Sequence, residues 1–280
     1  MMPNLLPVTV CIPVRNEEKN LPSCLEALGD IFEEILVIDS GSTDLTKEIA
    51  KNADAKVLDF NWDGKFPKKR NWVLRNHDFA TQWVLFIDAD ERVTPEFVTE
   101  MRKALVDTPH VGFWISLTNW FMGNPLNHGD VFHKLAMFRV GAGEYECFPE
   151  DSWSHLDMEV HEHPVLEGSV GEIKARLEHH DFRGMKHYLT KHNEYSSWEA
   201  NRFQWLRNAG AEEWGKLNSR QRFKYRNLGR WWLGWVYWVV AYVVKKGFLD
   251  GKSGWTFNHL KRRYFGEIRL KILEAENFLE

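Results

Sequence analysis

Two aspartates stand one residue apart at the end of a hydrophobic run. Asp88 and Asp90 come directly after the apolar residues 84–87, and Ala89 separates them. Hard divalent cations prefer oxygen ligands, and Mg²⁺ is typically held by one or two carboxylates together with substrate phosphates. The motif therefore favours a metal site, although a simple turn before a helix capped by Thr94 would use the same residues.

A second acidic group lies further along the chain, among histidines. Asp157, Glu159 and Glu162 are candidates for a general base, which removes a proton from an attacking hydroxyl group. If this segment is a strand, Asp157 and Glu159 share one face and Glu162 points the other way, and the pattern alone does not decide which face meets a substrate. The histidines lack the regular spacing of zinc ligands, so we expect no dedicated zinc site from His155, His161, His163, His179 and His180.

Alternating strands and helices are expected to position these residues. The first 106 residues contain four short hydrophobic segments, each followed by a helical pattern; the predicted strands are 8–14, 35–38, 55–60 and 82–88. This alternation is typical of a doubly wound α/β layer with a parallel sheet. Ligands bind such sheets beyond the carboxyl ends of the strands, so we expect the polar residues that follow the first, second and fourth strands to lie on one edge.

The charge of the chain is divided unevenly, although the net charge is only −4. Residues 216–280 carry 14 Lys and Arg against 5 Asp and Glu, a net of +9, so the preceding residues carry −13. The apolar, Trp-rich run 231–244 has cations at both ends and is shorter than the ~20 residues that a spanning helix needs. Our interpretation is an in-plane membrane attachment, with a buried core or oligomer helix as the alternative. A solid apolar block of this kind does not favour nucleic acid.

Four sequence strings occur in a recognisable order: CIPVRNEEKNLPSCLEAL, VIDSGSTDLTKEIA, KKRNW and VLFIDADERVTPEF. Together they resemble the nucleotide-sugar-binding half of family 2 glycosyltransferases with a GT-A fold, most of all bacterial enzymes of lipopolysaccharide-core and cell-surface polysaccharide assembly. The likeness is strong over residues 8–106 and weaker in FMGNPLNHGD, EVHEHP and HHDF. It implies an α/β fold, a GT-A type, Rossmann-like doubly wound mixed sheet with a C-terminal helical extension.

The resemblance also implies a nucleotide site at the strand ends. The residues that would line a uracil-type base pocket are Pro13, Arg15 and Glu17. The nucleotide would further meet Asp39 at its base, Asp44 near its ribose, and backbone donors in the segment that contains Ser40 and Gly41.

The same resemblance places the metal and the diphosphate near the paired aspartates. Asp90 would be the principal metal ligand, and Asp88 would contact the ribose or the metal. A histidine from the later part of the chain would reach the metal or the diphosphate, with His180 as the candidate and His179 next. The cations that would face the base or the diphosphate are Lys68, Lys69 and Arg70; because this helix begins FPKKRNW and has no glycine-rich version of the motif, the cation that meets phosphate stays open.

The implied activity is inverting transfer of a sugar from a nucleotide-sugar donor, a UDP-sugar foremost, to a glycan or lipid-linked acceptor in cell-envelope polysaccharide biosynthesis. It would use Mg²⁺ or Mn²⁺ and a carboxylate base, for which the resemblance favours Glu162 over Glu159 and Asp157. Two alternatives remain. One is a non-catalytic sugar-nucleotide-binding scaffold. The other is a sugar nucleotidyltransferase, for which a basic, glycine-rich loop would be expected after the first strand.

We divide the chain into a glycosyltransferase domain, 1–225, and a basic, Trp-rich helical tail, 226–280. The domain would consist of a nucleotide-sugar-binding half, 1–106, and an acceptor half, 107–225. Three cysteines without metal-type spacing suit a reducing compartment, and the N-terminus lacks the cationic region of a signal peptide. We therefore expect a cytoplasmic protein with peripheral contact to the inner membrane.

Overall fold

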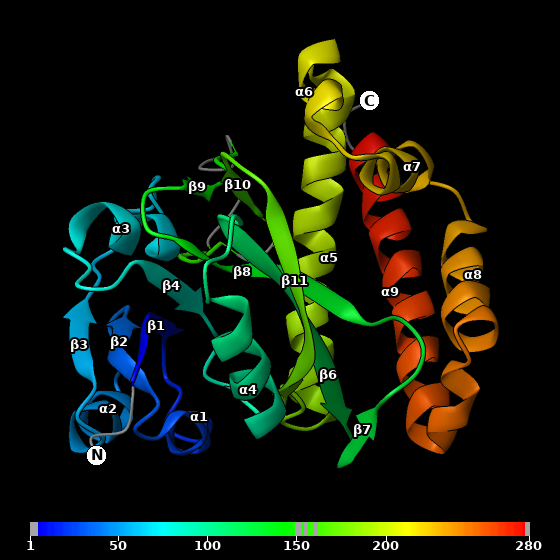
Figure 1. The fold of residues 1–280 in the computed structure, drawn as a ribbon. Coiled ribbons are helices and arrows are strands. Elements are labelled where there is room, and N and C mark those ends of the chain that lie inside the picture. Colours follow the sequence, from blue (N-terminus) through cyan, green and yellow to red (C-terminus); the bar gives the residue numbers. More distant parts are fainter. Residues whose placement is uncertain (1–4, 149–152, 154–155, 160–161, 278–280) are drawn as a thin grey trace. The chain divides into compact units, whose positions relative to one another are not determined.

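The structure is a computed structural model that describes residues 5–148, 153, 156–159 and 162–277 (Figure 1). The chain forms two compact units. The first contains Met1–Asn119 and Phe132–Asp181, and the second contains Trp120–Val131 and Phe182–Glu280. This division differs from the predicted boundary at residue 225, because the long helix α5, Met185–Asn208, belongs to the second unit.

The first unit is built on a mixed sheet, which confirms the predicted fold class. Strands β3, β2, β1 and β4 are parallel neighbours, and the sheet continues through β8, β6, β11 and β5. Strand β8 runs antiparallel to both β4 and β6, so the parallel alternation ends there. The strands are β1 (Leu6–Val14), β2 (Phe32–Asp39), β3 (Lys56–Asp59), β4 (Trp83–Phe86), β5 (Glu91–Arg92), β6 (Gly112–Phe121), β8 (Phe132–Arg139) and β11 (Val170–His179).

Continuous apolar runs explain why the parallel strands form. All four residues of β4 are buried, and Pro7 is the only exposed residue of β1, as expected for strands that are covered on both faces. Helices follow the strands as predicted, and Thr94 caps the last of them by accepting a hydrogen bond from the Phe97 N–H at 3.1 Å. The helices are α1 (Leu21–Leu28), α2 (Thr46–Asn52), α3 (Lys69–Asn76) and α4 (Pro95–Ala104).

A small two-stranded sheet completes the first unit. Strand β9, Gly143–Tyr145, pairs antiparallel with β10, Pro164–Leu166. Asn71 of α3 joins it: its Nδ2 donates to the carbonyl of Tyr145 at 2.9 Å, and its Oδ1 accepts from the Tyr145 N–H at 2.8 Å. The small sheet therefore anchors the chain on both sides of the acidic segment near helix α3.

The second unit is almost entirely helical and contains the predicted C-terminal extension. Its core packs apolar side chains from α5 and the later helices, including Leu206, Leu228 and Phe265. Within the described part of the chain, we find no helix long and apolar enough to cross a membrane. Besides α5, the elements are β7 (Asn124–Leu126), α6 (Ala211–Lys216), α7 (Ser219–Asn227), α8 (Leu233–Trp238), a π-helical segment (Val239–Val244), a 3-10 turn (Gly247–Asp250) and α9 (Gly251–Asn277).

Candidate active site

Asp39 is fixed at the end of β2 by the turn that follows it. Its Oδ2 atom accepts hydrogen bonds from the backbone N–H groups of Gly41 and Ser42, both at 3.0 Å, and Lys47 Nζ lies 3.4 Å from the same oxygen. The side chain is fully buried, and its Oδ1 atom has no hydrogen-bond partner among the described residues. A buried oxygen without a donor is costly, so this atom fits a hydrogen-bond donor on a bound ligand.

The loops after β1 and β2 are tied together by Asn16. Its N–H donates to Ser42 Oγ at 2.8 Å, and its Oδ1 accepts from the Thr43 N–H at 2.8 Å. Asn16 has a φ of 56°, a left-handed conformation that asparagine adopts more readily than most residues. The two strand ends are therefore held as one rim, as the strand order requires.

Asp44 also serves this rim. Its Oδ1 accepts from the Thr46 N–H at 3.0 Å, and its Oδ2 accepts from the Glu18 N–H at 3.2 Å. Partial burial acts to raise the pKa of Asp44, but hydrogen bonds from Thr46 and Glu18 outweigh it and hold the pKa below its ordinary value. The ribose contact of Asp44 stays a prediction. Of the other predicted nucleotide contacts, Pro13 and Ala89 are buried, Glu17 and Ser40 are partly exposed, and Arg15 and Gly41 are exposed.

The three cations that begin helix α3 are buried. Lys69 Nζ donates to the carbonyl of Val14, at the end of β1, over 3.0 Å. Arg70 Nη2 donates to Asp88 Oδ1 at 2.7 Å, which links α3 to the paired aspartates. Burial lowers the pKa of Lys69. Burial acts in the same direction on Arg70, but Asp88 and other nearby acidic groups outweigh it, and the pKa of Arg70 rises.

Each candidate general base contacts a different one of these cations. Glu162 Oε1 lies 2.8 Å from Lys68 Nζ, and both side chains are buried. Asp157 Oδ2 lies 3.3 Å from Lys69 Nζ, and the Asp157 carbonyl accepts from the Lys69 N–H at 3.0 Å. Arg70 Nη1 donates to the carbonyl of Glu159. The acidic segment therefore lies directly on the start of α3.

Glu159 also caps helix α3. Its Oε2 accepts from the Arg70 N–H at 2.9 Å, and its Oε1 accepts from the Asn71 N–H at 3.0 Å. These are two of the backbone donors that a helix N-terminus leaves without internal partners, and the negative charge is favourable at that end of the helix. The described residues 156–159 form bends and no strand, so the alternation considered for Asp157 and Glu159 does not apply to them.

The paired aspartates lie on a turn between β4 and β5. The Asp88 N–H donates to Glu91 Oε2 at 3.0 Å, and the same carboxylate pairs with Lys134 of β8. Burial raises the pKa of Glu91, and the nearby charge of Lys134 offsets part of this increase. The carbonyl of Asp90 accepts from the His180 N–H at 2.7 Å. The sequence analysis did not name Glu91 as a site residue, although its position directly after Asp90 could have indicated that it lies at the same turn.

Of the two neighbouring histidines, His179 has its ring toward Asp90. Its Nε2 lies 3.6 Å from Asp90 Oδ1, while its Nδ1 contacts Asn119 Oδ1 at 2.8 Å. The ring of His180 contacts Glu178 instead, with Nε2 and Oε2 3.0 Å apart. A metal-binding histidine is commonly oriented by a partner on its other ring nitrogen, as Asn119 orients His179. His180 as a ligand stays a prediction, and the geometry adds His179 beside it.

These residues fit a divalent cation by their chemistry. Asp88 and Asp90 place carboxylate oxygens on one short turn, and His179 adds a ring nitrogen next to them. The two carboxylates are the protein donors that Mg²⁺ or Mn²⁺ uses when substrate phosphates complete the shell. Within the described residues, no group of three or more His, Cys, Asp or Glu side chains is arranged to hold a metal by itself. His155 and His161 lie outside the described residues.

Comparison with known proteins matches this chain to one family. The family model described as Glycosyl transferase family 2 matches residues 9–150, just over half of the chain. The lipopolysaccharide core biosynthesis glycosyltransferase LpsC of Rhizobium meliloti is 28% identical over 210 residues, which cover 71% of this chain and 72% of LpsC. A TPR repeat-containing protein of Synechococcus elongatus is 38% identical over 109 residues, 39% of this chain. This chain matches only 26% of the length of that protein.

Solved structures give a weaker likeness. Glucosyl-3-phosphoglycerate synthase of Mycobacterium tuberculosis, in complex with Mn²⁺, UDP and glucosyl-3-phosphoglycerate, is 26% identical to this chain. The match covers 40% of this chain and 43% of the other, with a TM-score of 0.33.

Proposed function

Because the chain belongs to glycosyl transferase family 2, we propose that it transfers a sugar from a UDP-sugar to a glycan or lipid-linked acceptor of the cell envelope. The carrying observation is the convergence at the ends of β1, β2 and β4. There the buried Oδ1 of Asp39 fits a hydrogen-bond donor on a ligand, and Arg70 links the cations at the start of α3 to Asp88 of the paired aspartates. The likeness to LpsC over most of both chains supports a lipopolysaccharide-type acceptor.

We assign the donor nucleotide to the rim formed by the first two strand ends. Asp39 would accept from an N–H group of the base, as the N3–H of uracil provides. The N–H groups of Gly41 and Ser42 both donate to Oδ2, the other carboxylate oxygen, at 3.0 Å. These two hydrogen bonds fix the orientation of the carboxylate and therefore the direction of Oδ1. Preorganised groups of this kind lose little freedom when a ligand binds.

Asp90 and Asp88 would hold a divalent metal, together with His179 or His180. The bound metal supplies Lewis-acid neutralisation of the charge that develops on a departing diphosphate. The chain's own contribution is positional. Glu91 accepts from the Asp88 N–H, and Arg70 holds Asp88 Oδ1, so the aspartate turn is fixed from two sides.

The acceptor hydroxyl needs a base, and we assign this role to Glu162. Lys68 holds its carboxylate at 2.8 Å in one orientation, whereas both carboxylate oxygens of Glu159 are engaged in capping α3. Asp157 is the remaining candidate. A base that takes the proton as the hydroxyl attacks opposite the leaving diphosphate gives inversion at the sugar carbon. Glu162→Gln should abolish turnover and leave donor binding intact; near-normal turnover would remove Glu162 from this role.

A thermal-shift panel with UDP-sugars and other nucleotide sugars, with and without Mn²⁺, tests the donor assignment. We expect UDP-sugars to stabilise the protein and Mn²⁺ to increase the shift, with slow release of UDP. Asp39→Asn should remove the nucleotide shift, and Asp90→Asn should remove its metal dependence. The matched control is Asp107→Asn, an exposed loop residue whose φ of 47° asparagine tolerates.

The outcomes separate the alternatives. No shift with any nucleotide would refute the donor assignment. A UDP shift without UDP release would favour a non-catalytic binding protein. If Asp88→Asn, and not Asp90→Asn, removes the metal dependence, the two aspartates have the opposite roles. We place the protein at the cytoplasmic face of the membrane, where a lipid-linked acceptor would be presented.

A further inference from the structure

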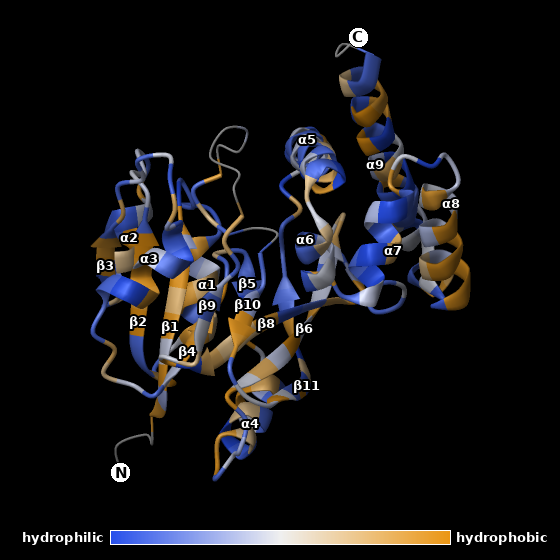
Figure 2. Ribbon diagram, turned by 90° about the horizontal axis from the view of Figure 1, so that it is seen from above, coloured by the Kyte–Doolittle hydropathy of each residue, from blue (hydrophilic) through white to orange (hydrophobic). Residues whose placement is uncertain are grey.

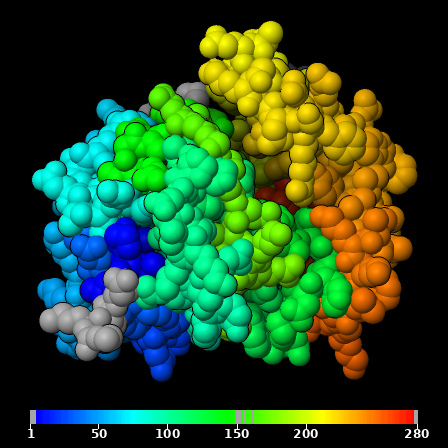
Figure 3. Space-filling view, in the orientation of Figure 1, coloured from blue at the N-terminus to red at the C-terminus, as the bar shows by residue number. Residues whose placement is uncertain are grey.

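An apolar stripe runs along one side of α8 and the π-helical segment that continues it. Its exposed side chains recur every four residues, which places them on one face of a helix. Figure 2 shows orange, hydrophobic residues alternating with pale ones along the helix labelled α8, whereas α7 is largely hydrophilic. In Figure 3 the orange part of the chain, which includes α8, lies at the surface. We call this surface the α8 stripe; its members are Trp235, Val236, Val239, Val240, Val243 and Val244.

The opposite side of the same helix is buried, so the stripe is not part of the core. Leu233 and Ala241 are buried, and the Tyr237 ring stacks on Phe265 of α9 with centroids 4.5 Å apart. Single exposed apolar residues are ordinary, but a contiguous apolar patch with polar borders marks a contact surface. The ends of the stripe carry Arg230, Lys245 and Lys246, all exposed.

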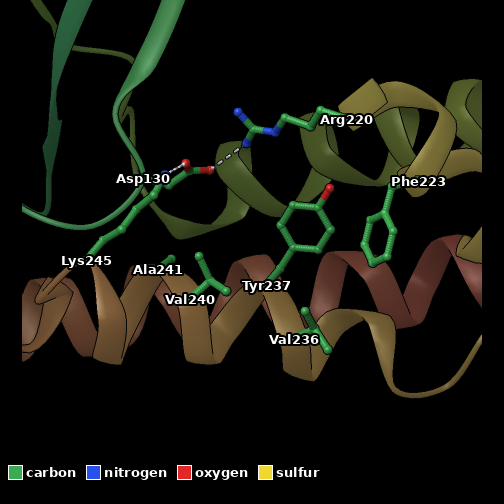
Figure 4. A pocket seen from close by; sticks show the side chains of 8 residues that line it. All are labelled: Asp130, Arg220, Phe223, Val236, Tyr237, Val240, Ala241 and Lys245. Atoms are coloured by element: carbon green, nitrogen blue, oxygen red, sulfur yellow. Dashed lines mark hydrogen bonds and ion pairs between the residues drawn. The ribbon is translucent and has the colours of Figure 1, made fainter. Parts of the chain in front are cut away.

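A pocket of about 340 Å³ opens beside the stripe, between α7 and α8. Figure 4 shows Val236, Val240 and Tyr237 along one wall, with Arg220 above them. Phe223 contributes a second aromatic side chain from α7. The pocket thus combines an apolar wall with a cation at its mouth, which is the composition that an amphiphilic anion requires.

The cations at this pocket exceed the negative charge that holds them. Asp130 Oδ1 accepts from Lys245 Nζ at 2.8 Å, while its Oδ2 contacts Lys261 and lies 3.5 Å from Arg220. One carboxylate therefore faces three cations, an excess of two positive charges. Burial acts to raise the pKa of Asp130, but Lys261 and Lys245 outweigh it and hold the pKa well below its ordinary value. The Arg220 side chain stays 68% exposed.

We propose that the α8 stripe docks on an anionic phospholipid bilayer and that the pocket takes the phosphate headgroup of one lipid, with Arg220 as its main contact. Trp235 of the stripe favours the headgroup region, the valines favour the acyl boundary, and the excess cations favour anionic lipid. A second copy of this chain fits less well, because two such surfaces would bring like charges together. This inference deepens the proposed envelope function and rests on it, since a lipid-linked acceptor is met at a membrane.

Vesicle flotation of the full chain tests the stripe. We expect it to float with vesicles of phosphatidylcholine and phosphatidylglycerol and to stay with the soluble fraction when only phosphatidylcholine is present. The double variant Val239→Glu and Val243→Glu should lose flotation. Leu45→Glu with Val106→Glu, two exposed apolar residues of the first unit, is the matched control and should float like the unchanged chain.

A pair of arginines on α7 tests the pocket. Arg222 is exposed on the same helix but does not line the pocket. Arg222→Gln should weaken vesicle binding about fivefold, the effect of one cation near an anionic surface. Arg220→Gln should weaken it by more than about tenfold, because a charge-assisted hydrogen bond to phosphate is lost as well. Equal losses in the two variants would overturn the headgroup site.

Two further results would overturn the stripe. One is an unchanged chain that never floats. The other is a dimer in solution that the stripe variant dissociates, which would assign the surface to a second copy. The UDP-sugar thermal shift of the unchanged chain is also measured, without vesicles. If that shift is present while flotation is absent, the lipid site fails and the donor assignment stands. If flotation is present while the shift is absent, the donor assignment fails and the lipid site stands.

Discussion

Replacing Glu159 with glutamine separates a helix-capping role from a catalytic one. The carboxylate is buried and accepts from two backbone N–H groups of α3, at 2.9 and 3.0 Å. Glutamine keeps the shape but offers one oxygen, so its amide N–H₂ would face a backbone donor. The lost charge-assisted hydrogen bond is worth about 1.5–3 kcal/mol, and the lost negative charge at the helix N-terminus adds about 0.3–1 kcal/mol.

The expected loss of unfolding free energy is therefore about 2–4 kcal/mol. At roughly 2–4 °C per kcal/mol for a chain of this size, the Tm should fall by on the order of 10 °C. Calorimetry measures the Tm and urea titration measures the free energy. Glu144→Gln is the control, because Glu144 pairs with Arg75 of the same helix at an exposed position and should cost less than about 1 kcal/mol.

Donor binding and turnover of the same variant complete the test. If Glu159 only caps α3, the loss of turnover should follow the weakened link between Arg70 and Asp88, and donor affinity should fall with it. An unchanged Tm would refute the capping argument. An unchanged Tm with intact donor binding and no turnover would make Glu159 the general base in place of Glu162.

Three other variants test the stability of the second unit. Asp130→Asn should lower the urea midpoint at pH 7. The depressed pKa of Asp130 gives stability that is present above the ordinary aspartate pKa and is lost as the pH falls, so the difference in midpoint between the variant and the unchanged chain should shrink below about pH 4. A difference that stays constant with pH would contradict this prediction. Gly254→Ala should cost about 1–3 kcal/mol, because its Cβ would lie 2.3 Å from the Gly247 carbonyl oxygen. Gly266→Ala, on the same helix with nothing within 4 Å, should raise stability by up to about 1 kcal/mol in the same calorimetric assay.

The part of the fold that repeats locally was predictable from the sequence. Buried parallel strands and their helices have characteristic periods, which predicted the α/β layer. The family and the mixed sheet, which the resemblance of the four sequence strings implied, are confirmed. The edge where the strand ends meet follows from the same order. The N-cap formed by Thr94 was also predictable, because its hydrogen-bond partner, the Phe97 N–H, is only three residues away in the sequence.

The pairing of acids with cations was not predictable. Glu162 is 94 residues from Lys68 in sequence, and Glu159 is 89 from Arg70. No local period relates such distant residues, and the strand considered as one possibility near Asp157 is not formed by residues 156–159. The sequence could not decide between His179 and His180 for a similar reason: the choice depends on how β11 pairs with β5 and β6, which sets the direction of each ring.

Arg70 is shared between two places that different substrates would occupy. Its Nη1 donates to the carbonyl of Glu159 in the acidic segment, and its Nη2 donates to Asp88 in the turn that carries the paired aspartates. A ligand that prefers one position of this guanidinium acts on both places at once. Thermodynamic linkage then makes the effect mutual, so the factor by which acceptor changes donor affinity equals the factor by which donor changes acceptor affinity. Binding of one substrate would then change the affinity for the other by this common factor, and changing Arg70 should remove the coupling.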